Sequence, residues 1–143
     1  MEINTQNKNE LQESLIKFAI ANNISVTFLP GDPYDPAISL KKARQIYINA
    51  NWHNPAEIPF IIGHEIGHVM MGEQGIIYWS KLGGFCSEEK PADLYSLKWI
   101  YEYSKKHADH FSDPGAFMQS YGIPWRMAHA VKVLFKNDHD LIY

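Results

Sequence analysis

Apolar side chains recur every three to four positions along several stretches of the chain, which is the spacing of one buried face of an α-helix. The clearest stretch begins at Asn54, where a capping asparagine precedes a proline and Glu57 occupies the capping-box position. It reaches Met71, and Gly72 provides a C-terminal cap. The predicted helices cover residues 10–21, 54–71, 88–104, 113–122 and 124–136.

Alternation of apolar and polar residues predicts two short strands, at residues 24–28 and 45–49, rich in β-branched and aromatic side chains. Residues 37–40 are a weaker candidate, and residues 74–80 are a further one. A helix followed by strands and then by helices predicts an α+β fold, with a small β-sheet packed against the helix at 54–71 and the helices after it. No repeat or linker divides the sequence, so residues 1–143 are expected to form a single domain.

The composition narrows the classes of partner and compartment. A 45% hydrophobic content is enough for one core, and a net charge of -3 offers no excess of positive charge to a phosphate backbone, which argues against direct binding of nucleic acid. Cys86 is the single cysteine, so no internal disulfide can form, and this favours the cytoplasm. The N-terminus lacks an apolar signal core, and the apolar stretch at 58–71 is too short to span a membrane.

One segment, His64-Glu65-Ile66-Gly67-His68, indicates a chemical function as well as a fold. Two histidines four apart project from one helix face on successive turns, so both can reach a single ion. Catalytic zinc takes such nitrogens, usually keeps three protein ligands, and leaves a fourth position to water. Glu65 is rotated by about a quarter turn from the first histidine, which places it beside the metal as the expected general base. The sequence therefore predicts a Zn²⁺-dependent metallopeptidase.

A third ligand is expected further along the chain. Glu89 and Asp93 are four apart at the start of the predicted helix at 88–104, so they share one face. Glu89 can complete a His, His, Glu site, with Glu88 as its rival, although an acidic first turn is also favoured by the helix dipole. Asp93 is expected to accept a hydrogen bond from the far nitrogen of a ligand histidine and to fix its tautomer. Residues 71 and 74 lack the glycine and histidine of a metzincin, which excludes that class.

A resemblance to the ImmA/IrrE family of small zinc metallopeptidases is carried by four segments: IIGHEIGHVMMG, EKPADLYSLKWI, QIYIN and YGIPWRMAHAVKVLF. The resemblance implies a gluzincin-like site with His64, His68 and Glu89 on the metal and Glu65 catalytic, and it places Asp93 where the family often has Asn or Asp. It also implies a protein substrate, namely a transcriptional repressor of a prophage or mobile element. Pro91 departs from a regular helix and is tolerable only in the first turn.

Other residues are weighed against ordinary structural roles. A tyrosine or histidine often stabilises the oxyanion at a zinc site, so four residues are candidates, each more often a core or surface residue: Tyr78, Tyr101, His107 and His110. His53, His129 and His139 have no partner at ligand spacing, and Cys86 is expected to be a small buried hydrophobe. Residues 117–131 could be described as a helix-turn-helix, but Arg126 and Lys132 are few cations for phosphate contacts.

Two functions from different classes remain open. The first is a zinc endopeptidase of narrow specificity that cleaves a partner repressor, with the strand at 45–49 as an edge that holds an extended substrate by strand addition. The second is a non-catalytic, metal-containing module that relieves repression by binding its partner protein.

Overall fold

The computed structural model describes residues 2–81, 89–107, 111 and 113–140, with side-chain detail for 9–72, 90–107, 111 and 113–138. The α+β class is confirmed, because five helices accompany one small sheet in these ranges. The helices are α1 (Glu2–Ala21), α2 (Ile58–Lys81), α3 (Glu89–Lys106), α4 (Pro114–Tyr121) and α5 (Ala128–Asp140). The strands are β1 (Ser25–Leu29), β2 (Ile38–Leu40) and β3 (Gln45–Asn49), and two 3₁₀ turns are η1 (Pro55–Glu57) and η2 (Trp125–Met127).

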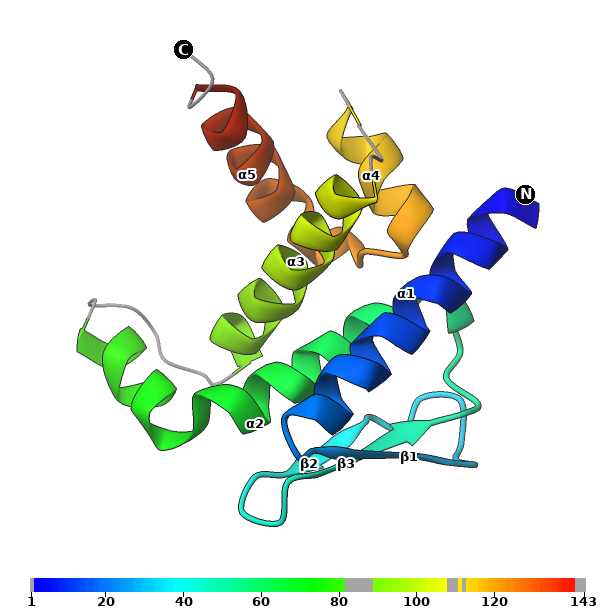
Figure 1. Ribbon diagram of the computed structural model, residues 1–143, viewed down its shortest axis with the longest axis vertical. Coiled ribbons are helices and arrows are strands. Elements are labelled where there is room, and N and C mark those ends of the chain that lie inside the picture. Colours follow the sequence, from blue (N-terminus) through cyan, green and yellow to red (C-terminus); the bar gives the residue numbers. More distant parts are fainter. Residues whose placement is uncertain (1, 82–88, 108–110, 112, 141–143) are drawn as a thin grey trace.

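The elements are arranged in layers, as Figure 1 shows. The sheet forms one side, α1 and α2 lie against it, and α3 packs on α2 from the side opposite the sheet, with α4 and α5 beyond. Leu11 and Leu15 of α1, Ile46 of β3 and Ile62 of α2 are all completely buried and belong to one hydrophobic cluster. Helix α2 is therefore the central element, and its polar motif lies between two packed layers.

The three strands have the order β1-β3-β2, with β1 parallel and β2 antiparallel to β3. The expectation that residues 45–49 form an edge strand is wrong, because β3 is hydrogen-bonded on both sides. The alternation of Ile46 and Ile48 identifies the buried face of that strand, but it carries no information about neighbours in the sheet plane. The edges of the sheet are β1 and β2, and β2 contacts α2.

Helix boundaries differ from expectation where apolar periodicity is weak or misleading. Helix α1 begins eight residues before the predicted start at residue 10, in a polar segment that carries no apolar stripe. The predicted strand at 74–80 is wrong, because those residues are helical. Gly72, with φ 51° and ψ −151°, breaks α2 as the expected cap, and a second helical segment then continues to Lys81. A short apolar run does not distinguish a strand from a buried helix by its pattern alone.

Two glycines let α3 approach α2 closely. A Cβ atom on Gly63 would overlap the Ser96 hydroxyl, and one on Gly67 would lie 3.0 Å from Cβ of Tyr95. The Ser96 hydroxyl also donates a hydrogen bond of 2.7 Å to the carbonyl of Phe60, inside the interface. Each glycine immediately precedes one histidine of the motif. The start of α3 is therefore held against the part of α2 that carries the polar side chains.

A third glycine fixes the C-terminal segment against η1. Gly122 ends α4 in the left-handed conformation, with φ 67° and its N–H bonded to the carbonyl of Met118. A Cβ atom here would overlap the backbone carbonyl of Ala56 in η1. The turn that follows, with Pro124 and η2, thus lies beside the N-terminal end of α2. No helix among the described residues is long and apolar enough to cross a membrane.

Candidate metal centre

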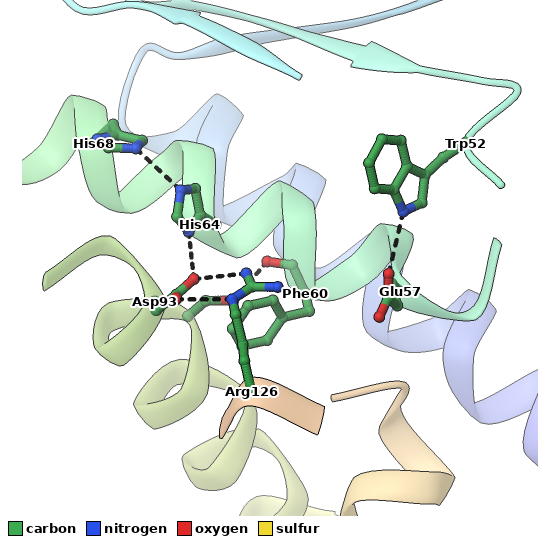
Figure 2. A network of polar contacts seen from close by, with 8 residues as sticks. Trp52, Glu57, Phe60, His64, His68, Asp93 and Arg126 are labelled. Carbon is green, nitrogen blue, oxygen red and sulfur yellow. Dashed lines mark hydrogen bonds and ion pairs between the residues drawn. The ribbon is translucent and has the colours of Figure 1, made fainter. Parts of the chain in front are cut away.

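The two histidines of the motif converge from successive turns of α2 (Figure 2). Nε2 of His68 lies 3.1 Å from Nε2 of His64, and the rings are nearly perpendicular, with an interplanar angle of 78°. Two nitrogens bound to one tetrahedral zinc at about 2.05 Å would lie about 3.3 Å apart, close to the distance observed. The ligand atoms of His64, Glu65 and His68 all lie within 4.8 Å of one another. This cluster can bind a metal ion.

The other ring nitrogen of His64 contacts Asp93 of α3. Nδ1 of His64 lies 2.7 Å from Oδ1 of Asp93, and both side chains are largely buried, at 12% and 15% exposure. An ionised carboxylate only accepts hydrogen bonds, so the imidazole donates from Nδ1. The Nε2 lone pair is then directed toward His68 and can serve as a metal ligand. The contact is the one that the sequence spacing predicted for Asp93.

Arg126 of η2 holds Asp93 from the opposite side. Its Nε donates to Oδ2 at 3.0 Å and its Nη2 donates to Oδ1 at 2.9 Å, in a two-pronged arrangement that Figure 2 shows. Burial by itself raises the pKa of Asp93, but hydrogen bonds from His64 and Arg126 and the positive charge of Arg126 outweigh burial, so the pKa lies below 3.8. The carboxylate is therefore ionised at neutral pH. One chain of contacts joins η2, α3 and α2.

Glu65 is only 5% exposed, yet it lines a cleft that also receives His64 and Arg126. A buried carboxylate on an otherwise apolar helix face costs free energy, which a neighbouring cation would offset. The cleft has a volume of about 510 Å³, and α2 forms its floor. Its walls come from the segment before β2, the loop after β3, and the turn around η2. The remaining lining residues are Pro36, Ala37, Trp52, Glu57, Ile61 and Pro124.

The third ligand predicted from the sequence is placed only in part. Glu89 is the first residue of α3, one turn before Asp93, but its side chain lies outside the described residues. Glu88, the alternative ligand, lies outside them altogether, as does Cys86. Pro91 falls in the first turn of α3, where its missing N–H has no helical acceptor to lose. The assignment of Glu89 to the metal stays a prediction.

Of the four candidates for oxyanion stabilisation, the two with described side chains are engaged elsewhere. Tyr101 is 8% exposed and donates a hydrogen bond of 2.7 Å to Asp138 of α5; burial, and then this carboxylate, raise the pKa of Tyr101. His107 stacks on Tyr103, and its Nδ1 lies 3.0 Å from the carbonyl of that tyrosine. The side chains of Tyr78 and His110 lie outside the described residues, as does that of His139.

The residues that sequence reasoning missed lie on the cleft walls. The sequence presents Arg126 as one of few cations in a possible helix-turn-helix, whereas in the structure it donates hydrogen bonds to Asp93. The sequence places Glu57 at a capping-box position, whereas in the structure its carboxylate accepts a hydrogen bond of 3.2 Å from the indole of Trp52 and lines the cleft. The sequence carries no signal for the role of Arg126, because its partner Asp93 lies 33 residues earlier in the chain.

Comparison of the sequence with protein-family models and with curated proteins finds no match. The resemblance to the ImmA/IrrE family therefore rests on the motifs of the sequence alone.

Proposed function

We propose that the chain is a zinc-dependent peptidase, with its metal on His64 and His68 and Glu65 as general base. The observation that carries the proposal is the convergence of the two Nε2 atoms at 3.1 Å, with an ionised carboxylate on the far nitrogen of His64. A hydrogen bond of this kind orients a ligand imidazole and raises its basicity. Glu89, one turn before Asp93 on α3, is our choice for the third ligand.

Zinc bound here would polarise a peptide carbonyl and lower the pKa of a bound water toward ~7. Glu65 would accept the proton of that water and pass it to the leaving amine. Its burial keeps the carboxylate within a poorly solvated site, where proton transfer between neighbours is favoured over exchange with bulk water. Asp93 and Arg126 would hold His64 in one orientation throughout, because both are fixed by hydrogen bonds of 2.7–3.0 Å.

We propose a protein as the substrate, since the cleft beside Glu65 has a volume of about 510 Å³ and is lined by both polar and apolar side chains. The choice of a transcriptional repressor, and of cytoplasmic action, follows from the resemblance and from the single cysteine. Strand addition at β3 is not available, because β3 is the central strand of the sheet.

The test combines metal content with cleavage. Wild type, Glu65→Gln, His68→Ala and the matched control His129→Ala, which removes an exposed histidine of α5, are purified and analysed for metal. Each is then incubated with a peptide library and with the repressor encoded next to its gene. We expect stoichiometric zinc in all except His68→Ala, and cleavage only by wild type and His129→Ala. Zinc binding in His68→Ala, or equal cleavage by Glu65→Gln, would show that the site is assigned wrongly.

A second function is favoured by one observation. Asp93 joins three elements by hydrogen bonds, to His64 of α2 and to Arg126 of η2, so a metal that fixes His64 would also stiffen this junction. A metal with this structural role would fit a non-catalytic module that relieves repression by binding its partner protein. Relief of repression in cells by Glu65→Gln, without cleavage of the repressor, would support this module; loss of relief in that variant would support the peptidase.

A further inference from the structure

The cleft has a second polar pair at the end away from the histidines. Figure 2 shows Trp52 and Glu57 near the N-terminal end of α2, and both line the same cleft as Glu65. Indole Nε1 donates to Oε1 of Glu57 at 3.2 Å. The indole is itself held by its neighbours, since Tyr34 meets it edge-on at 6.5 Å and His53 lies at 4.4 Å between ring centroids. An aromatic ring and a carboxylate are thus fixed side by side on the cleft wall.

The charges that line the cleft are unevenly balanced. Arg126 is opposed by Asp93 at 2.9 Å, and a metal on the histidines would balance Glu65. For Glu57, by contrast, no basic side chain lies within ion-pair distance in the part of the chain that the structure describes. Its hydrogen bond from Trp52 orients the carboxylate without neutralising it. This end of the cleft therefore carries a negative charge next to an aromatic surface.

The separation along the helix sets where a ligand would sit. Glu57, Ile61 and Glu65 are spaced by four residues, so they follow one face from η1 into α2. Eight residues of helix correspond to about 12 Å. An extended peptide advances about 3.3 Å per residue, so a substrate residue whose side chain reaches Glu57 lies within about four residues of the bond attacked at Glu65.

We propose that Trp52 and Glu57 form a subsite for a basic side chain, lysine or arginine, of the peptide substrate. The subsite rests on the proposed function, because its register is counted from the metal centre. The carboxylate of Glu57 accepts a charge-assisted hydrogen bond from the cation. The indole face of Trp52 attracts the same cation through its ring electrons and covers the apolar stem. Ile61, Pro36 and Ala37 supply apolar contacts along the path between the subsite and Glu65.

The experiment uses short peptide hydroxamates, because the hydroxamate anchors on the metal and fixes the register without catalysis. One position at a time, up to four residues from the hydroxamate and on either side of it, carries lysine, norleucine or glutamate. Dissociation constants are measured by calorimetry on the zinc-loaded protein. We expect lysine at one position to bind about ten- to a hundredfold tighter than norleucine, and glutamate to bind more weakly than norleucine.

Variants identify the origin of that preference. Glu57→Gln keeps an acceptor for the indole but removes the charge, and we expect the preference for lysine to fall to about threefold or less. The Glu57→Lys variant should bind the peptide with glutamate at that position more tightly than the peptide with lysine. Glu13→Gln, which removes an exposed carboxylate on α1, should behave as wild type. Thermal unfolding of each variant shows that it is folded, and the comparison of peptides on wild type needs no variant at all.

The outcomes separate the subsite from the metal centre. Equal binding of lysine and norleucine at every position, or a preference that survives in Glu57→Gln, overturns the subsite and leaves the peptidase in place. Failure of the wild type to take up zinc overturns the metal centre, and failure of every hydroxamate to bind the zinc-loaded wild type overturns an open, catalytic position on the metal; either result removes the subsite that is counted from it.

Discussion

Replacement of Asp93 separates the orienting role of its hydrogen bond from the packing of α3. In Asp93→Asn, the amide oxygen can take the place of Oδ1 and keep the contacts of 2.7 Å with His64 and 2.9 Å with Arg126. The amide nitrogen then faces Nε of Arg126, where Oδ2 accepted a bond of 3.0 Å, so two donors meet. The negative charge beside the imidazole is also lost. In Asp93→Ala, both the charge and the orienting contact disappear.

These differences set the expected magnitudes. Loss of a partner behind a metal ligand typically weakens metal binding by 10–100-fold. We expect about tenfold weaker zinc binding for Asp93→Asn, or about 1.4 kcal/mol, because the histidine keeps its tautomer. For Asp93→Ala we expect about a hundredfold, because the ring can also turn. The metal-free proteins should lose about 1 kcal/mol or less of unfolding free energy from the broken pair with Arg126, because that side chain is 55% exposed and water can solvate it.

Competition with a chromophoric chelator at fixed neutral pH measures the zinc affinities, and urea unfolding of the metal-free proteins measures the stabilities. Glu102→Gln is the matched control, because it removes a carboxylate that is 62% exposed on the same helix. Zinc affinities of both Asp93 variants within twofold of wild type would refute the view that this carboxylate orients His64. An equal loss in Glu102→Gln would assign the effect to the charge of α3 as a whole.

Further predictions concern stability. Gly122→Ala should lower the free energy of unfolding, measured in urea, by about 2–5 kcal/mol. An alanine here is strained in the left-handed conformation, and its Cβ atom also overlaps the carbonyl of Ala56. Gly63→Ala should lower both stability and zinc affinity, measured in the same assays, since it pushes α3 away from α2. Tyr101→Phe should lower the free energy of unfolding by about 1 kcal/mol at neutral pH, because it removes the hydrogen bond to Asp138. This cost should shrink above pH 10.0, because the raised pKa of Tyr101 favours ionisation in the unfolded chain; unfolding at both pH values checks it. Zinc at a hundred times its dissociation constant should stabilise wild type by about 2.7 kcal/mol, and chelator should reverse this, while His68→Ala shows no effect in thermal melts.

What could be predicted from the sequence was set by local geometry. The spacing of His64 and His68 fixes their shared helix face, and the spacing of Glu89 and Asp93 fixes theirs, because both follow from the pitch of an α-helix. The contact between Asp93 and His64 could be expected once the two helices were paired. The class of the fold followed in the same way from the order of helices and strands.

What could not be predicted depends on neighbours distant in sequence. The central position of β3 is decided by which strands flank it, and neither flank is encoded in residues 45–49. Arg126 contacts Asp93 from a turn that follows Gly122, whose close approach to Ala56 is a matter of tertiary packing and not of local sequence. The helical state of residues 74–80 shows the same limit, since an apolar run satisfies either secondary structure until its packing is known.

The two glycines that precede the histidines also decide how α3 can move. Ser96 and Tyr95 of α3 occupy the space that a Cβ atom would need at Gly63 and Gly67. We therefore expect a shift of α3 along α2 by a fraction of a turn to bring these side chains against the backbone of α2. The nearest alternative arrangement is a full helical turn away, about 5.4 Å, which would separate Asp93 from His64 entirely. We therefore expect the candidate metal site to respond to packing in an all-or-none way. Small forces would leave its geometry unchanged, and a force large enough to displace α3 by a turn would separate its residues in one step.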